Sequence, residues 1–372
     1  MINRTLKILD QLISIDTTTT HDTMEAVNFV QTVLHNSGVD TRIIMSENGA
    51  RASIVATIGN PSTPGIIFSG HLDTVAAEKD EWSVPPHKLT LSGSRAYGRG
   101  TTDMKGAIAV LLAHVDILKS SGRTFHIALT HDEESKVHAI GRVLDAGFGH
   151  PPAGCIVMEP TGLSTVVAHK GVYLCRICVT GKTAHSAQPE LGVDASEYIV
   201  KIYEKLQSEF KNRSAGYARD TGFSPDRSTM NIGTLNAGDA VNKIPGTAEL
   251  TCALRYIPDD DIRGFNESIM QFCYELDHKI KDKDKSCGIV LKTEINIESF
   301  SANTESDFIK MFPGNHTKAS FGTEAGFFEK RGINTVVFGP GNISQAHIKD
   351  EFIEILELEK FGKWITEFCT RT

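Results

Sequence analysis

Two histidines and a group of carboxylates follow predicted strands in a pattern that suits divalent metal ions. His71 and Asp73 end the run GIIFSGHLDTV, and the two-residue period of a strand puts both side chains on one face. Asp73 can therefore accept a hydrogen bond from the ring of His71, as the carboxylate behind a metal-ligating histidine does. Taken alone, the HxD pattern is also explained by a strand-end histidine followed by a turn aspartate.

Two loops supply further carboxylates. In YGRGTTDMKGA, Asp103 precedes an apolar-periodic helix, so it suits either a metal ligand or a helix N-cap. A dinucleotide-binding loop is disfavoured, because Gly98 and Gly100 lack the third glycine of GxGxxG. Three consecutive carboxylates follow the strand in TFHIALTHDEES: Asp132, Glu133 and Glu134. Like charges that lie together need water or cations, so this segment is either an acidic surface turn or a cation site.

The predicted topology joins these signals. CIVMEP ends a fourth strand with Glu159, and NTVVFGPGNISQAHIKDEF ends a fifth and supplies His347 from the loop beyond. Each candidate lies at, or one loop beyond, the carboxyl end of a strand, where open α/β sheets bind ligands. Two histidines and three carboxylates around two divalent ions are nearly neutral once a bridging hydroxide is added. This balance favours two metals over one.

An alternation of strands and helices must position these side chains. ASIVATIG, GIIFSG, TFHIALT and GCIVMEP alternate with helical patterns, which predicts an α/β fold with a largely parallel sheet and helices on both faces. After Glu159 the order becomes strand, helix, two strands, helix and strand, the order of a ferredoxin-like α+β unit. NTVVFGPG and a final helix restore the first pattern. We predict a discontinuous domain of residues 1–172 and 286–372, with residues 173–285 inserted into it.

Composition and charge exclude several classes of protein. With 372 residues, 40% hydrophobic and 23% charged, the chain is long enough for two ordinary globular domains. The formal net charge of -8 argues against a nucleic-acid partner. MINRTLKILDQLISID predicts an amphipathic helix rather than a signal peptide, and no apolar run is long enough to cross a membrane. We expect a cytoplasmic protein with seven reduced cysteines, the CxxC pair Cys175 and Cys178 included.

Seven motifs together resemble those of the zinc aminoacylase and peptidase family that includes acetylornithine deacetylase, succinyl-diaminopimelate desuccinylase, carboxypeptidase G and aminoacylase. They are SGHLDTV, GRGTTDMKG, THDEE, VMEPTGL, GKTAHSAQP, NKIPG and QAHIKDEF, in the family's order. The resemblance covers nearly the whole chain. It implies a catalytic domain with an inserted dimerisation, or lid, domain, and a homodimer formed through the insertion.

The same resemblance implies a metal ligand set. One zinc ion would be bound by His71, Asp103 and Glu159, and the second by Asp103, Glu134 and His347, with Asp103 bridging them. Cobalt or manganese also suits an oxygen-rich site with two imidazoles.

Catalytic and substrate-binding roles follow from the resemblance as well. Glu133 would be the general base for a metal-bound water, with Asp73 behind His71. His185 in GKTAHSAQP would stabilise the oxyanion, commonly from the partner subunit, although a surface-loop histidine is the ordinary alternative. Asn242 in NKIPG would bind substrate, and Arg255 in CALRYIP would grip an α-carboxylate, unless it is simply an exposed strand arginine.

Within the family, EPTGLSTVVAHKG and FGTEAGFFEKRGINTVVFGPGNISQAH look most like acetylornithine deacetylase, an enzyme of arginine biosynthesis. The expected substrate is therefore a small N-acyl amino acid that carries an acetyl group. A desuccinylase and a dipeptidase or carboxypeptidase share the metal chemistry and remain open. A non-catalytic metal-containing binding protein is disfavoured, because it has no need of Glu133.

After DEE, ESKVHAIGR replaces the family's usual short glycine-containing turn, and we expect His138 to be a solvated helix residue.

Overall fold

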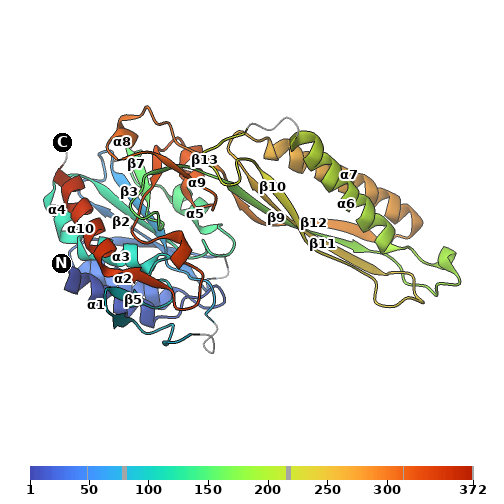
Figure 1. Cartoon of the computed structure of the whole chain (residues 1–372), viewed down its shortest axis with the longest axis horizontal. Helices are drawn as coiled ribbons and strands as arrows, with labels where there is room; N and C mark the ends of the chain where they lie inside the picture. The colour runs from blue at the N-terminus through green and yellow to red at the C-terminus, as the bar shows by residue number, and fades with distance from the viewer. Residues whose placement is uncertain (48, 78–81, 215–218, 313, 371–372) are drawn as a thin grey trace. The chain divides into compact units, whose positions relative to one another are not determined.

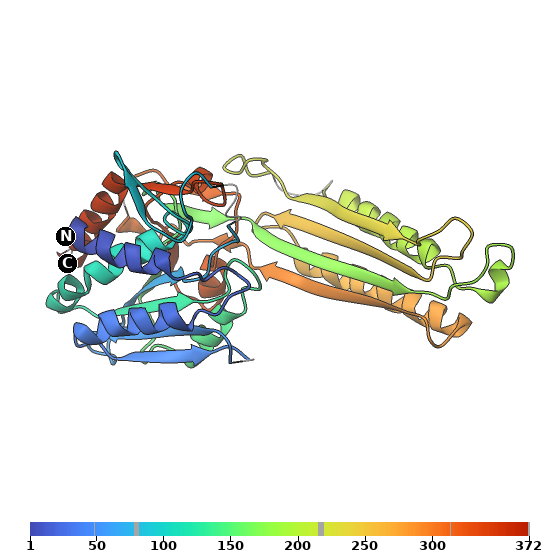
Figure 2. The same cartoon turned by 90° about the horizontal axis from the view of Figure 1, so that it is seen from below.

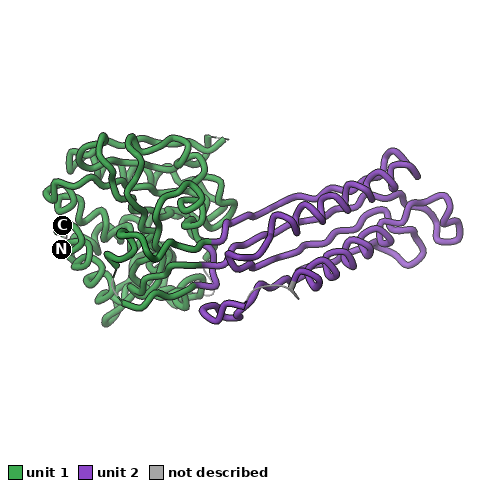
Figure 3. Tube along the Cα trace, turned by 90° about the horizontal axis from the view of Figure 1, so that it is seen from above, with its two compact units in different colours: residues 1–168, 300–318, 323–372 green, residues 169–299, 319–322 purple. Residues whose placement is uncertain are grey.

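The computed structural model describes residues 1–47, 49–77, 82–214, 219–312 and 314–370 and divides into two compact units (Figure 3). Unit 1 comprises Met1–Ala168, Phe300–Lys318 and Thr323–Thr372, and unit 2 comprises His169–Ser299 and Ala319–Gly322. Unit 2 is thus inserted into unit 1, and its first boundary lies close to residue 172. Its second boundary differs from the expected residue 286, because Gly288–Ile297 forms a strand of the unit 2 sheet.

Unit 1 is built on a nine-stranded sheet (Figure 1). Its spatial order is β1 (Thr41–Met45), β2 (Ala52–Ile58), β6 (Phe125–Thr130), β3 (Ile66–His71), β7 (Gly154–Val157), β15 (Thr335–Val337), β8 (Val166–His169) and β13 (Phe300–Ser301), and β14 (Thr317–Ala319) pairs with β8. The central strands β6, β3, β7 and β15 run parallel, whereas β2 runs against both of its neighbours. The predicted α/β fold is confirmed, and the carboxyl ends of the central strands share one edge.

Helices cover both faces of this sheet, because successive strand residues point to opposite sides. Ile54, Ala56 and Ile58 of β2 share a core with α1 (Ile2–Ser14), α2 (Met24–Asn36), α3 (Lys105–Ala113) and α10 (Ile355–Thr370). The intervening Val55 is buried on the other side, where α5 (Ala139–Ala146) and α9 (Ala325–Lys330) pack against the strands (Figure 1). The short helices α4 (Val115–Ser120) and α8 (Asp307–Lys310) and the 3-10 turn η3 (Ile343–Gln345) also belong to unit 1.

A small second sheet in unit 1 was not foreseen from the sequence. It contains β4 (Thr90–Ser92), β5 (Arg95–Tyr97) and β16 (Phe352–Glu354), with β5 in the middle. β5 and β16 are antiparallel, and Arg95 lies opposite Glu354. This pairing places the loop that follows β5 and carries Asp103 against the loop that precedes β16 and carries His347.

Unit 2 has the predicted ferredoxin-like order of elements. These are β9 (Gly171–Thr180), α6 (Ala195–Ser214), β10 (Thr229–Ala237), β11 (Thr247–Tyr256), α7 (Ile262–Lys283) and β12 (Gly288–Ile297), with a 3-10 turn, η2, at Pro189–Leu191. The antiparallel sheet order is β10-β11-β9-β12. Both helices pack on one face of the sheet, whose inward residues form a core of their own (Figure 2).

The structure also bears on two expectations from composition, reduced cysteines and the lack of a membrane-spanning segment. All seven cysteines are free thiols; six are buried, and Cys178 in β9 is half-buried. Within the described ranges, no helix combines the length and the apolar character that a membrane crossing requires.

Candidate metal centre

Asp103 lies between two imidazole rings at the carboxyl edge of the unit 1 sheet. Its Oδ1 is 3.0 Å from Nε2 of His71, the last residue of β3, and its Oδ2 is 3.3 Å from Nε2 of His347. Oε1 of Glu134 is 2.8 Å from the same nitrogen of His347. A carboxylate that faces two imidazoles through its two oxygens has the arrangement of a ligand shared by two cations.

Glu133 and Glu159 complete the cluster around His71. Glu159 Oε1 is 3.7 Å from Nε2 of His71. Ligand atoms of His71, Asp103 and Glu134 lie within 4.8 Å of one another, and so do those of His71, Glu133 and Glu159. The Glu134 side chain is only 7% exposed, so the DEE segment is not an acidic surface turn. The structure therefore brings together all five predicted metal ligands and the predicted base.

The ring of His71 is oriented by a backbone carbonyl rather than by the carboxylate expected from the sequence. Its Nδ1 donates to the backbone oxygen of Asp73 at 2.9 Å, whereas the Asp73 carboxylate is 3.7 Å away. That carboxylate instead accepts the backbone N–H groups of Glu133 and Glu134, at 3.2 and 3.1 Å. Asp73 is fully buried and fixes the acidic loop, because a side chain two residues beyond a strand end can reach the neighbouring strand's loop.

Burial and mutual repulsion set the protonation of the cluster. Burial, with the charge of Glu159, raises the pKa of Glu133 well above its usual value. Burial, with the charge of Asp103, raises the pKa of Glu134 to about 7. Hydrogen bonds to Asp103 and Glu134 raise the pKa of His347 to about 10. Buried carboxylates that resist ionisation in this way would be stabilised as anions by a nearby cation.

Divalent cations fit this arrangement. Because a carbonyl only accepts hydrogen bonds, the donating Nδ1 of a neutral His71 leaves the Nε2 lone pair facing Asp103 and Glu159. Within the part of the chain that the structure describes, the ion pairs of Asp103, Glu134 and Glu159 are with His71 and His347, and no lysine or arginine joins them. Imidazole nitrogens and carboxylate oxygens in this ratio suit zinc, cobalt or manganese.

The loop that carries Asp103 is not a simple helix cap. α3 begins at Lys105, its N-cap position is Met104, and no side chain caps it. Gly98 and Gly100 have φ angles of 151° and 88°, which favour glycine and let the loop turn sharply before Asp103. The N-cap alternative for Asp103 is therefore excluded.

Two buried glutamates beside the centre were missed by the sequence analysis. Glu351 is fully buried and accepts hydrogen bonds from Arg99 and from the loop that carries Asp103. Glu324 is 1% exposed, and its Oε2 accepts from the hydroxyl of Ser69 at 3.3 Å. Both lie in motif strings, QAHIKDEF and FGTEAGFF, but nothing in these strings separates a buried glutamate from a solvated one.

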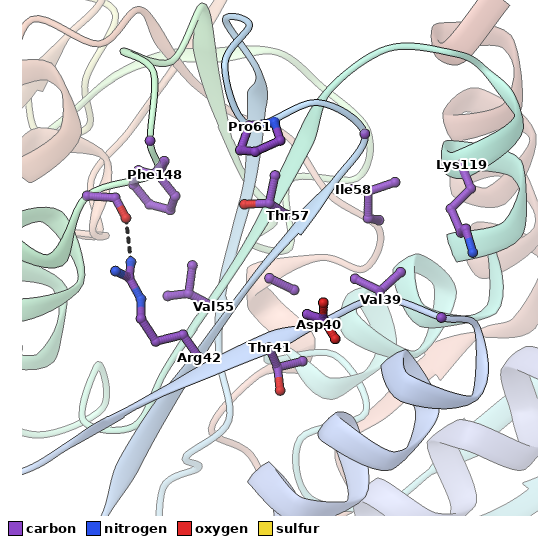
Figure 4. A pocket seen from close by; sticks show the side chains of 15 residues that line it. Val39, Asp40, Thr41, Arg42, Val55, Thr57, Ile58, Pro61, Lys119 and Phe148 are labelled. Atoms are coloured by element: carbon purple, nitrogen blue, oxygen red, sulfur yellow. Dashed lines mark hydrogen bonds between the residues drawn. The ribbon is translucent and has the colours of Figure 1, made fainter.

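The pocket in Figure 4 lies away from this edge of the sheet. It is lined by residues 38–42, 55–59 and 147–149 together with Pro61 and Lys119, and Arg42 donates to the backbone oxygen of Gly147 there. Ile58 pairs with Phe125, the first residue of β6, whereas His71 pairs with Thr130, the last. The pocket is therefore at the amino edge of the central strands and is separate from the metal cluster.

A second cavity, of about 720 Å³, lies at the carboxyl edge and includes the unusual segment after Glu134. The carboxylate of Asp132 accepts the backbone N–H groups of His138 and Ala139 and so holds the start of α5. His138 is exposed at the N-cap position of α5 and lines the cavity. The segment thus forms one wall next to the loop that carries Glu133 and Glu134.

The remaining predicted residues belong to unit 2, where they fall into two groups. His185 and Asn242 lie on neighbouring loops at one end of the sheet, because the backbone N–H of Ser186 donates to the carbonyl of Asn242 at 3.1 Å. Arg255 is at the other end of β11, opposite Val172. The chain rises ~3.4 Å at each of the eight steps from Thr247 to Arg255, so these two ends of β11 are roughly 27 Å apart.

His185 has a defined hydrogen-bonding state. Its Nδ1 accepts the backbone N–H of Ala187 at 3.1 Å. In the neutral ring the proton must then be on Nε2, which makes that nitrogen a hydrogen-bond donor. His185 is exposed, so this donor can reach a ligand.

Comparison with known proteins gives one consistent match. Residues 67–371 match the family described as peptidase family M20/M25/M40. An acetylornithine deacetylase from Aliivibrio salmonicida is 31% identical over 325 residues, which cover 85% of this chain and 83% of that protein. A probable succinyl-diaminopimelate desuccinylase from Staphylococcus aureus is 27% identical over 384 residues, which cover 94% and 92%. An M20 family metallo-carboxypeptidase from Sulfolobus solfataricus has a similar fold, with a TM-score of 0.74 at 17% identity over 98% of both chains.

Proposed function

The chain belongs to peptidase family M20/M25/M40 and is a metal-dependent hydrolase of amide bonds, and from this premise we propose that it removes an acetyl group from the nitrogen of an amino acid such as ornithine. One observation carries the proposal: the carboxylate of Asp103 faces two imidazoles, and a carboxylate oxygen of Glu133 lies within 4.8 Å of ligand atoms of His71 and Glu159. The 31% identity to an acetylornithine deacetylase supports the acetyl group, and the 27% identity to a desuccinylase keeps succinyl as the alternative.

We assign the two metal positions from the contacts. His71, Asp103 and Glu159 would hold one ion, and Asp103, Glu134 and His347 would hold the other. Bound divalent ions would polarise the amide carbonyl and make a water molecule more acidic. Zinc is the first candidate for both positions, with cobalt and manganese as alternatives.

The chain's own residues would carry the proton and hold the substrate. Glu133, half-buried and raised in pKa, would take a proton from water and deliver it to the leaving amine. His185, with its proton on Nε2, would donate to the oxyanion. Arg255 would bind the α-carboxylate through its planar guanidinium, and Asn242 would contact the substrate beside His185.

The separation within unit 2 implies that two copies of the chain build one site. An N-acyl amino acid, about two residues long, spans roughly 7 Å. His185 and Arg255 of one copy lie at sheet ends that are roughly 27 Å apart, so they cannot touch the same substrate molecule. The active form would therefore be a homodimer in which unit 2 of one copy contributes to the other's site.

Mixing inactive variants tests this arrangement. His185→Ala and Arg255→Ala should each lose about 10²–10³-fold in kcat/KM. After subunit exchange the mixture should recover about a quarter of wild-type activity, because half of the dimers are mixed and one of two sites in each is intact. A mixture of His185→Ala with Asn242→Ala is the matched control; it should recover nothing, because both residues lie at the same end. Activity no greater than that of the parents in the first mixture would contradict a shared site.

A substrate panel tests the reaction itself. The metal-stripped protein should release no amine from N-acetyl, N-succinyl or dipeptide substrates, and added zinc or cobalt should restore turnover. We expect N-acetylornithine to have the highest kcat/KM. A preference for N-succinyl or dipeptide substrates would support the proposed metal-dependent hydrolysis but contradict the proposed acetyl substrate. No turnover of any member by the metal-loaded protein would favour a non-catalytic metal-containing protein.

A further inference from the structure

Glu351 gathers four donors around a carboxylate that has no contact with solvent. It is 0% exposed. Its Oε2 accepts from Arg99 Nη1 at 2.7 Å and from the backbone N–H of Gly100 at 3.1 Å. Its Oε1 accepts from the backbone N–H groups of Thr102 and Asp103 at 2.8 and 3.1 Å. The loop from Arg99 to Asp103 is thus wrapped around a single side chain.

These bonds join two of the loops that supply candidate metal ligands, those of Asp103 and His347. Glu351 lies four residues after His347, and its own carbonyl accepts from the backbone N–H of Gly98 at 3.0 Å. Its carboxylate receives a bond from the backbone of Asp103, the residue whose carboxylate faces both histidines. A shift of Glu351 would therefore move Asp103 and His347 relative to each other.

Arg99 makes the arrangement possible by balancing the charge. The Arg99 side chain is 4% exposed, donates to the backbone oxygen of Ala76 at 3.3 Å and lies over the ring of Trp82 at 5.0 Å. A buried carboxylate without such a cation would lose stability, and removal of one partner leaves the other charge uncompensated. Breaking the ion pair between Arg99 and Glu351 would therefore disturb the loop that carries Asp103.

We propose that Glu351, held by Arg99, is a positioning residue that sets the distance between Asp103 and His347 and so controls how tightly the second metal ion is bound. This inference rests on the proposed two-metal function. Neither residue is one of the candidate metal ligands or substrate-binding residues; Glu351 acts through the backbone of residues 100–103. Outer groups that orient metal ligands commonly change metal affinity 10–100-fold when they are replaced.

The chain contains a matched control for this pair. Arg95 and Glu354 form a second arginine–glutamate bridge between the same two segments, with Nε 2.7 Å from Oε1. They pair across β5 and β16, and their side chains are 45% and 28% exposed. Glu354 contacts Ser94 and Arg95 but makes no described bond to residues 100–103. A general effect of losing such a bridge should therefore appear equally in Glu354→Gln.

The test compares Glu351→Gln, Glu351→Asp and Glu354→Gln in the full-length chain. Zinc affinity is measured by competition with a chelator, and the cobalt form by its visible absorption spectrum. We expect Glu351→Gln to bind the second zinc equivalent 10–100-fold more weakly and to change the cobalt spectrum, with kcat recovering as zinc is raised. Glu351→Asp keeps the charge and should recover part of the affinity, and Glu354→Gln should match the wild type.

Several outcomes would overturn the inference. Wild-type zinc affinity and cobalt spectrum in a folded Glu351→Gln would show that the carboxylate does not position the ligands. An equal loss in Glu354→Gln would show a general effect of the bridge. If Glu351→Gln does not fold, Arg99→Lys, which keeps the charge but not the planar group, replaces it, and an unchanged second affinity there also counts against the proposal. A wild-type chain that binds no metal would instead refute the proposed function, which keeps the two failures distinct.

Discussion

Glu133→Gln is expected to keep both metal ions and to lose about 10²–10⁴-fold in kcat. The amide has nearly the shape of the carboxylate but cannot accept a proton from water or return it to an amine. The backbone N–H of residue 133 would still donate to Asp73, so the loop should remain in place. Turnover of N-acetylornithine and zinc content per chain, measured on the same preparation, check the two halves of this result.

The neighbouring glutamate is the natural comparison for this variant. Glu134 is held on the same Asp73 carboxylate through its own backbone N–H, and its side chain is 2.8 Å from His347. Glu134→Gln should lose metal as well as activity. Ligand atoms of Glu133 also lie within 4.8 Å of those of His71 and Glu159, so a direct ligand role is geometrically possible. Loss of zinc from Glu133→Gln would therefore replace the base assignment with a ligand assignment.

The elements of the fold that could be predicted from the sequence are those with a strong local period. The four parallel strands read as short apolar runs, and their carboxyl ends share an edge whatever their lateral order. His71 and Glu159 could therefore be placed together without a structure. The order of strands and helices in unit 2 was also predicted from their periods, whereas the sheet order β10-β11-β9-β12 comes from the structure.

The contacts that could not be predicted depend on short or nonlocal pairing. β5 and β16 are three residues each, too short for a periodic signal, yet their pairing aligns the Asp103 and His347 loops. The expected boundary at residue 286 cut off the final strand that the ferredoxin-like order requires, and only the pairing of β12 with β9 fixes that strand in the unit 2 sheet.

The partners of individual polar side chains were also beyond sequence reasoning. The HxD pattern predicted a hydrogen bond from His71 to the Asp73 carboxylate. In the structure the chain turns after the strand, so the His71 ring donates to the backbone carbonyl of Asp73, and the Asp73 carboxylate accepts from the loop of Glu133 and Glu134. Asn242 and Arg255 were assigned to one substrate from separate motifs, and only the length of β11 reveals that they lie at opposite ends of the unit 2 sheet. Period and motif describe faces and strand ends; they do not describe distances along a strand.

Glu324→Gln is expected to change how the stability of the metal-free protein depends on pH. Glu324 is 1% exposed, and burial raises its pKa from 4.5 to about 8. One carboxylate oxygen accepts from Ser69, and the other has no partner among the described residues. A folded pKa above the unfolded value means that the folded state holds the proton longer. The stability from this group is therefore full below pH ~4.5 and falls as the pH rises through about 8.

The size of this effect follows from the difference between the two pKa values. A change from 4.5 to about 8 corresponds to up to ~5 kcal/mol of stability lost across this range. Glutamine is neutral at every pH and close in shape to the protonated acid. The variant should therefore match the wild type near pH 5 and be more stable by several kcal/mol near pH 9. Urea unfolding midpoints, measured in the presence of a chelator from pH 5 to 9, give the comparison.

The chelator matters, because bound cations near His71 would favour the ionised form of Glu324 and reduce the difference between the two proteins. Restoring zinc should therefore bring the wild-type and variant curves together at high pH. Glu305→Gln, at a side chain that is 86% exposed, is the control and should leave the pH dependence unchanged. Wild-type and Glu324→Gln curves that stay parallel from pH 5 to 9 without metal would show that Glu324 is ionised throughout. The metal centre would then have a permanent negative charge beneath it, and the metal-free protein would have to balance that charge elsewhere.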